Sequence, residues 1–156
     1  MIQLNTGFHF DELPTGMRFR SRSRTVTEAD LVSFINLSWL NEELFTDTSD
    51  RAHMAIAGRV VPGALVYAFA EGLITPSMQG TGLAFLNAEL DIAAPTFVGD
   101  TIHVECEVIE RRPTAKPGRG LVRTRNSVLN QDGKTVLTYT PLRMMRMKPA
   151  DEKKAH

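Results

Sequence analysis

The sequence predicts an α+β fold in which one buried helix precedes a long antiparallel sheet. Between Pro62 and Pro76 the only charged residue is Glu71, which is typical of a helix with little solvent-facing surface. From Gly80 onward, apolar and polar residues alternate in short runs that turn residues separate, and this pattern indicates strands. A helical block followed by a block of strands favours the α+β class over a regular alternation of the two.

Length and composition limit what the chain can be. Its 156 residues are enough to bury one core, and we expect a single domain over residues 10–147 with a polar tail at 148–156. Eighteen basic and eighteen acidic residues give no net charge, so no global attraction to nucleic acid or to an anionic membrane is expected. The single Cys106 cannot form an internal disulfide, and we expect it to be a small buried residue of a strand.

The same features bear on the cellular setting. The N-terminal residues lack the basic start and apolar run of a signal peptide. No stretch approaches the roughly eighteen apolar residues of a membrane span, and nothing resembles a zinc-ligand cluster. We therefore expect a cytoplasmic protein that holds no metal ion.

The first forty residues predict an edge strand and a helix. Residues 17–26 alternate, but only the start of this run has an apolar face, so we expect an exposed or edge strand. Its four arginines lack interleaved aromatic residues, and we interpret them as a solvated face rather than a nucleic-acid patch. Thr27 and Asp30 predict the start of a helix that ends near Ser38. Residues 39–57 are expected to be irregular or weakly helical.

The second and more buried helix is expected to begin at Pro62, because a proline at the first helical position sacrifices no hydrogen bond. Two stripes with a spacing of four follow, with Leu65, Phe69 and Leu73 on one face and Ala64, Ala68 and Gly72 on the adjacent face. Small residues allow another backbone to approach closely, so the second stripe predicts a helix enclosed by a curled sheet.

The rest of the sequence predicts four or five long antiparallel strands. We expect strands at 83–92, 101–109, 121–129 and 135–147. In the second of these, the side chains of Ile102, Val104, Cys106 and Val108 are predicted to point to one face. The turn between the last two strands contains Asp132-Gly133, a strong hairpin signal. Such a sheet leaves open edges, and dimerisation by edge pairing is expected to cover them.

Several motifs carry a family resemblance. They are Thr25 to Asp30 with Phe34, then Val60-Val61-Pro62-Gly63-Ala64-Leu65, then Ala94-Pro95 through Gly99-Asp100-Thr101, and finally Leu129-Asn130-Gln131-Asp132-Gly133-Lys134. In order and spacing they resemble the MaoC-like (R)-specific enoyl-CoA hydratases, or acyl dehydratases, from about Phe10 to Met147. The resemblance implies a hot-dog fold, in which a long antiparallel sheet wraps around one central helix.

The chain departs from this family at the catalytic motif. The hydratases carry S-G-D-x-N-P-L-H-T-D after the first helix, and the corresponding run here is Ser38-Trp39-Leu40-Asn41-Glu42-Glu43-Leu44-Phe45-Thr46-Asp47. The family's catalytic Asp falls on Leu40 and its catalytic His on Phe45. Hydration needs a base to activate water and an acid to protonate the α-carbon, and neither side chain can serve. The substitutes nearest in sequence are Asn41, which can orient a water, and Glu42, Glu43 and Asp47, which can act as bases.

The binding half of the family's site is retained. By resemblance, a backbone N–H near Gly63 donates to the thioester carbonyl, and a helix N-terminus with its positive dipole end suits an oxygen that gains charge. Coenzyme A also carries phosphates. We interpret the basic residues of the loop after the second long strand as phosphate-binding, namely Arg111, Arg112, Lys116 and Arg119.

The leading hypothesis is therefore a homodimeric MaoC-like protein that binds acyl-CoA or another acyl-pantetheine thioester. It is an enoyl-CoA hydratase only if a non-standard set of residues replaces the usual Asp/His pair. Thioester hydrolysis is an alternative, because one carboxylate and one carbonyl donor can suffice. Another alternative is a non-catalytic ligand-binding or structural subunit, and a further one is a heterodimer whose partner supplies the missing pair. No cofactor is expected beyond the coenzyme A of the ligand, and neither nucleic acid nor a membrane is expected as a partner.

Overall fold

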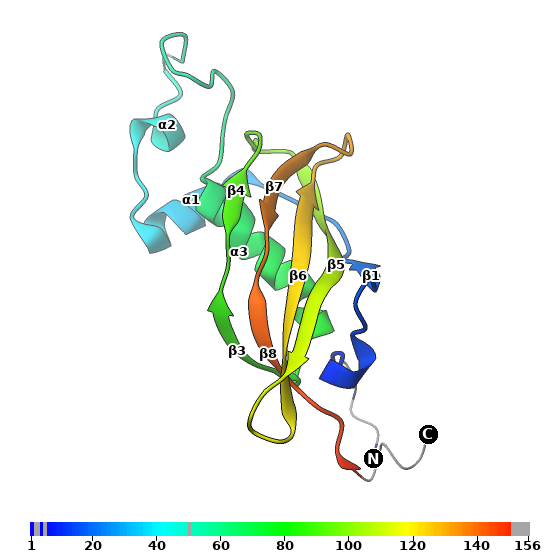
Figure 1. The fold of residues 1–156 in the computed structure, drawn as a ribbon. Helices are drawn as coiled ribbons and strands as arrows, with labels where there is room; N and C mark the ends of the chain where they lie inside the picture. Colours follow the sequence, from blue (N-terminus) through cyan, green and yellow to red (C-terminus); the bar gives the residue numbers. More distant parts are fainter. Residues whose placement is uncertain (2–3, 5, 50, 151–156) are drawn as a thin grey trace.

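The computed structural model describes residues 1, 4, 6–49 and 51–150 (Figure 1). Its helices are α1 (Glu28–Ser38), α2 (Glu43–Thr46) and α3 (Gly63–Ile74), with short 3-10 turns η1 (Phe10–Glu12) and η2 (Thr75–Ser77). Its strands are β1 (Arg18–Arg20), β2 (Arg24–Thr25), β3 (Gly82–Asn87), β4 (Leu90–Ile92), β5 (Thr101–Pro113), β6 (Arg119–Leu129), β7 (Thr135–Tyr139) and β8 (Leu142–Arg146).

Within these residues, the eight strands form one antiparallel sheet. β1 and β2 both pair with β5, β5 pairs with β6, and β6 pairs with β7 and then β8. β4 pairs with β7 and β3 pairs with β8, so that β3 and β4 together form the last strand of the sheet. The two open edges are thus β1–β2 on one side and β3–β4 on the other.

Helix α3 packs against one face of the sheet, and the main core lies between them (Figure 1). Leu65, Val66 and Ala70 of α3 are buried with Val104 of β5 and Val128 of β6. Each valine or leucine side chain removed from water in this way contributes about 1.5–3 kcal/mol. The predicted arrangement of one helix followed by an antiparallel sheet is confirmed.

The predicted start of α1 is confirmed in detail. The Thr27 hydroxyl accepts a hydrogen bond from the Asp30 N–H at 3.1 Å, and the Asp30 carboxylate accepts one from the Thr27 N–H at 2.9 Å. This reciprocal capping box satisfies two donors that the helix leaves unpaired. The helix ends where Trp39 adopts a left-handed conformation with φ of 64°.

The alternation of β5 and the turn after β6 are confirmed as well. Ile102, Val104, Cys106 and Val108 are all buried. Burial raises the pKa of the Cys106 thiol to about 12. In the turn, Gly133 has φ of 75°, and the Asn130 side-chain oxygen accepts hydrogen bonds from the Asp132 and Lys134 N–H groups.

One expectation from the sequence was wrong, and another falls partly outside the described residues. The small-residue stripe of α3 does not face the sheet, because Ala64, Ala68 and Gly72 are exposed. The sheet covers the opposite side of the helix, so the prediction that this stripe lets the sheet approach was wrong. The predicted tail begins at Lys148, whose N–H donates to the Asp11 carboxylate at 2.7 Å. Residues 151–156 of that tail lie outside the described residues.

Candidate functional site

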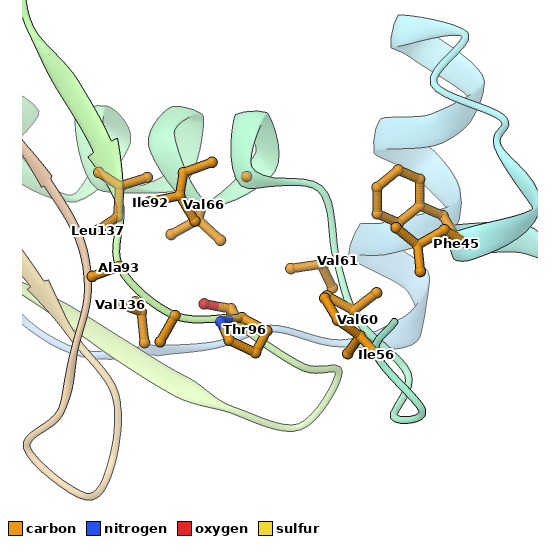
Figure 2. A pocket seen from close by; sticks show the side chains of 14 residues that line it. Phe45, Ile56, Val60, Val61, Val66, Ile92, Ala93, Thr96, Val136 and Leu137 are labelled. Atoms are coloured by element: carbon orange, nitrogen blue, oxygen red, sulfur yellow. The ribbon is translucent and has the colours of Figure 1, made fainter. Parts of the chain in front are cut away.

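A cavity of about 380 Å³ opens at the N-terminal end of α3 (Figure 2). Gly63 and Val66 of α3 form one wall, and Ile92 of β4 with Leu137 of β7 forms the wall toward the sheet. Figure 2 shows Phe45 on the other side of this space, carried by the segment that contains α2. The volume lies within the range of small-molecule pockets.

The cavity is apolar and uncharged. Its described lining residues include one with a polar side chain, Thr96, and none with an ionisable one. Thr96 also holds the entry to α3, because its carbonyl accepts a hydrogen bond from the Val61 N–H at 2.9 Å. Such a surface suits an aliphatic chain and offers no side chain that can transfer a proton near neutral pH.

Gly63 contributes the polar feature of the site. Pro62 caps α3, and its carbonyl accepts the first helical hydrogen bonds from Leu65 at 3.0 Å and Val66 at 3.3 Å. The N–H groups of Gly63 and Ala64 therefore precede the helical ladder, at the positive end of the helix dipole. A Cβ on Gly63 would overlap the Cδ1 atom of Ile92, so any larger residue there requires the end of the Ile92 side chain to shift.

The two positions that correspond to the family's catalytic pair are placed differently. Phe45 lines the cavity, and its carbonyl accepts a hydrogen bond from Arg59 at 2.8 Å. Leu40 is half-buried and lies outside the lining. The apolar ring of Phe45 thus occupies one side of the cavity, and the described lining residues include no acid.

The predicted substitute residues are not brought to the cavity. Asn41, Glu42 and Glu43 are exposed and do not line it. Asp47 is also outside the lining, and its carboxylate accepts hydrogen bonds from the Ser49 hydroxyl and N–H at 2.6 and 2.8 Å. These two bonds hold the pKa of Asp47 below its usual value. A catalytic role for these four residues stays a prediction, and it requires their segment to move.

Two arginines hold the segment over the cavity. Arg59 joins the Phe45 carbonyl to Glu28 of α1, with an Nη2 to Oε1 distance of 3.0 Å. Arg51 donates to the carbonyls of Asp47, Ala57 and others within the same loop. The sequence does not reveal these tethers, because the acceptors are backbone carbonyls that any residue supplies.

The four predicted phosphate-binding residues lie at the β5–β6 hairpin, at the other end of the sheet (Figure 1). Arg111 stacks over the Phe10 ring at 4.2 Å, and Arg119 contacts the Met144 sulfur at 3.8 Å. The other two members, Arg112 and Lys116, are exposed. Within one chain the hairpin does not adjoin Gly63, and phosphate binding there stays a prediction.

A second group of polar side chains was not predicted from the sequence. Glu71 of α3 accepts hydrogen bonds from the Tyr139 hydroxyl at 2.7 Å and from the Arg143 guanidinium. Burial and the neighbouring Glu71 raise the pKa of Tyr139. Asn126 is fully buried beside them. The lone charge at Glu71 in an apolar helix was the available signal, because a buried charge needs a partner.

Two further findings concern the described residues only. None of their helices is long and apolar enough to cross a membrane. Their histidine, cysteine, aspartate and glutamate side chains include no group of three or more that could hold a metal ion.

Comparison with known proteins identifies the fold. No protein-family model and no curated protein matches the sequence. Among solved structures, the chain is similar to an Archaeoglobus protein described as a monoamine oxidase regulatory protein, with 27% identity and a TM-score of 0.84 over 95% of this chain and 100% of that one. It is also similar to a MaoC-like dehydratase from Rhodospirillum rubrum, with 26% identity and a TM-score of 0.83 over 92% of this chain and 99% of that one.

An (R)-hydratase, PhaJ1 from Pseudomonas aeruginosa, is similar as well, with 27% identity and a TM-score of 0.73 over 91% of this chain and 88% of that one. The first two of these likenesses extend over nearly the whole chain. The predicted hot-dog fold is confirmed. The predicted resemblance to the MaoC-like hot-dog family is confirmed by these solved structures.

Proposed function

We propose that this protein binds an acyl thioester, with the thioester carbonyl at the N-terminus of α3 and the acyl chain in the apolar cavity. The observation that carries the proposal is the opening of a helix N-terminus onto an uncharged, apolar cavity at Gly63. The unpaired N–H groups there suit a carbonyl oxygen. The lining side chains suit an aliphatic chain of limited length.

The same geometry favours binding over hydration. The family's proton-transfer positions hold Leu40 and Phe45, and the acids between them in the sequence, Glu42 and Glu43, are exposed. Loss of positioned proton transfer reduces a rate by roughly 10² to 10⁴. We therefore propose acyl-CoA or acyl-pantetheine binding as the function, with any hydration of an enoyl thioester slow by comparison with the family's hydratases.

We also propose that the protein works as a homodimer. Every residue of β3 and β4 is exposed, including Leu83, Phe85, Leu90 and Ile92. A long apolar edge strand exposes unpaired backbone groups and promotes association. Pairing of this edge with its copy on a second chain buries it, and the two-fold symmetry common to homodimers makes the two edges antiparallel.

Two measurements on the same samples test the ligand class. We expect butyryl-CoA and crotonyl-CoA to raise the melting temperature, since a ligand at a hundredfold its Kd adds about 2.7 kcal/mol to the stability of the folded state. We expect little loss of enoyl absorbance from crotonyl-CoA, with a family hydratase as the active control. Release of free coenzyme A thiol, followed in parallel, would instead identify a thioesterase.

The carbonyl donor is tested with a single variant. Gly63→Val places a side chain where Ile92 stands, so we expect it to abolish butyryl-CoA binding. Gly72→Ala serves as the matched control, because it adds a methyl group to the same helix where a Cβ meets nothing within 4 Å. Equal affinity of both variants and the parent would contradict the assignment of the donor.

A further inference from the structure

A second hollow lies at the opposite end of α3 from the apolar cavity. It is a groove of about 860 Å³ between η2, the N-terminal segment around Phe8, and β1. Phe8, Phe19, Leu73 and Ile74 line its apolar part, and the centroids of the Phe8 and Phe19 rings are 5.5 Å apart. The volume lies within the range of small-molecule sites, so the groove can hold a ligand with an apolar body.

The wall that carries Phe8 is held by backbone hydrogen bonds. The Phe8 N–H donates to the Ser77 carbonyl and the Gly7 N–H donates to the Gln79 carbonyl, each at 2.8 Å. The two segments approach so closely that a Cβ on Gly7 would lie 2.6 Å from the Gln79 nitrogen. The apolar wall therefore rests on a fixed backbone.

Arg20 and Arg22 bring two positive charges to the lining. Both side chains are exposed, and neither has an ion pair or a side-chain hydrogen bond within the residues that the structure describes. Glu105 stands opposite Arg20 in the strand register, but its carboxylate lies 3.6 Å from His103 Nε2. The described lining residues include no acid. Two unpaired guanidinium groups without a nearby acid create a positive potential that attracts an anion.

Ser21 fixes the backbone between the two arginines. Its N–H donates to the Val104 carbonyl, and its hydroxyl accepts from the Val104 N–H, both at 2.9 Å. The same hydroxyl donates to the Arg22 carbonyl at 2.7 Å. Both guanidinium groups thus extend from an ordered backbone, which lowers the entropy cost of holding a ligand.

The chemistry of the lining distinguishes among possible occupants. A guanidinium group matches a planar carboxylate and donates two parallel hydrogen bonds to it, while the apolar side chains beside it suit an apolar body. β1 has three residues, of which Arg18 and Arg20 are charged, and charges on a short edge strand oppose pairing with another strand. A small amphipathic acid therefore fits the groove better than an extended peptide or a second copy of this chain.

We propose that this groove binds a medium-chain carboxylic acid as its anion, with the carboxylate at Arg20 and Arg22 and the aliphatic chain over Phe8 and Phe19. The site is separate from the cavity at Gly63, and the proposal does not depend on the proposed function. A ligand in the groove leaves the N-terminus of α3 free.

Nuclear magnetic resonance can locate the ligand and measure its affinity at the groove. We expect octanoate to shift the ring signals of Phe8 and Phe19 until they saturate, and to show nuclear Overhauser effects to those rings. Octan-1-ol should bind there at least about tenfold more weakly, because it lacks the charge. Acetate should leave the ring signals unchanged, because it lacks the apolar body.

Three results of this titration would overturn the proposal. They are ring signals that do not respond to octanoate at millimolar concentration, an affinity for octan-1-ol equal to that for octanoate, and Overhauser effects only to cavity residues such as Val66 and Ile92. From hexanoate to octanoate, the affinity should also rise about two- to fourfold for each methylene group, depending on how fully the group is buried.

A pair of double variants tests the two arginines. Arg20→Gln with Arg22→Gln should weaken octanoate binding by about tenfold or more. Arg18→Gln with Arg125→Gln is the matched control, because it removes two exposed positive charges of the same sheet that lie outside the groove lining. All four side chains are exposed, so both double variants should keep the melting temperature of the parent. Equal octanoate affinities of the two double variants would contradict the role of the arginines.

Butyryl-CoA separates this site from the thioester site. If the parent protein binds butyryl-CoA, the octanoate affinity at Phe8 and Phe19 should be the same with the thioester bound, because the groove and the cavity lie at opposite ends of α3. Displacement of octanoate from these rings by butyryl-CoA would overturn the proposal of a separate site. If the parent does not bind butyryl-CoA, the proposed function fails, and the octanoate titration tests the groove as before.

Discussion

The two halves of α3 face very different surroundings. Around Gly63 and Val66, the helix borders an apolar cavity whose described lining has no ionisable side chain. Two turns further on, the partly buried Glu71 forms a polar layer with Tyr139 and Arg143, both of which donate hydrogen bonds to its carboxylate. Charged side chains are thus present in the layer around Glu71, where the chain supplies partners for them. They are absent from the described lining of the cavity, where we propose that a ligand binds. We therefore expect substitutions in the polar layer to change the stability of the fold and substitutions in the cavity to change ligand affinity.

The largest effect is expected from removal of the charge in the polar layer. Glu71→Leu leaves Arg143, which is 13% exposed, without its carboxylate. An unpaired buried charge costs about 3 kcal/mol, and urea unfolding should show a loss of this size. Glu71→Leu combined with Arg143→Met should recover most of it, since a buried ion pair replaced by apolar residues is often neutral. Substitutions of surface residues usually change the free energy of unfolding by less than about 0.5 kcal/mol. A change of that size for Glu71→Leu alone would contradict the importance of the pair.

At the cavity, by contrast, we expect a substitution to lower ligand affinity and to change the stability of the fold only slightly. Val66→Phe fills part of the space at its inner wall, so we expect the affinity for hexanoyl-CoA to fall by about tenfold, or roughly 1.4 kcal/mol. The free energy of unfolding should change by less than about 1.5 kcal/mol, because an open cavity accepts volume that a packed core does not. The effect should shrink for acetyl-CoA, whose chain does not extend as far. An equal loss for both ligands would show that the inner wall does not contact the acyl chain.

A smaller effect is expected at the hydroxyl of the polar layer. Tyr139→Phe removes one donor to Glu71, which keeps its bond to Arg143. The loss should be about 1 kcal/mol, typical of one intramolecular hydrogen bond, because the Glu71 carboxylate keeps its bond to Arg143. Thermal unfolding with and without butyryl-CoA measures it, and the stabilisation by ligand should equal that of the parent. A change in that stabilisation would mean that the layer belongs to the ligand site.

The smallest effect concerns the thiol beneath the same layer. The pKa of Cys106 is raised by burial to about 12, so the folded protein keeps the thiol proton at a pH where the unfolded chain loses it. The neutral thiol therefore stabilises the fold below the ordinary pKa of 9.0, and this advantage is lost as pH rises above it. Relative to Cys106→Val, the parent should lose about 1 kcal/mol between pH 7 and pH 10. An identical pH profile of the two proteins would argue against burial as the cause.

The part of the fold that was predictable from the sequence depends on local chemistry. The capping box at Thr27 and Asp30 and the alternation of β5 need only neighbouring residues, and both predictions are confirmed. The small-residue stripe failed because two adjacent stripes of α3 can each face a sheet, and the sequence does not specify the rotation of the helix. Buried contacts of Val66 and Ala70 determine that rotation.

In the candidate site, too, features that depend on neighbouring residues were predictable and features that depend on distant contacts were not. Gly63 was predicted at the start of a helix, and the structure places it in the cavity wall. The acids Glu42 and Glu43 were selected by sequence position alone. The chain turns at Trp39, where φ is positive, and leaves both side chains exposed. The partnership of Glu71 with Arg143 joins residues far apart in the chain, and no local pattern predicts it.

The order of strands also has a consequence for how the chain folds. The two longest strands, β5 and β6, are joined by the short segment 114–118, so their pairing closes a small loop. β1 also pairs with β5, with Phe19 opposite Cys106. These two strands are far apart in the sequence, because α1 and α3 lie between them. Because distant contacts form more slowly than local ones, we expect the β5–β6 hairpin to form early and the N-terminal edge to close last. In pulse-labelled hydrogen exchange, the amides of β5 and β6 should therefore become protected before those of β1. The edge formed by β1 and β2 should be the last part of the sheet to fold.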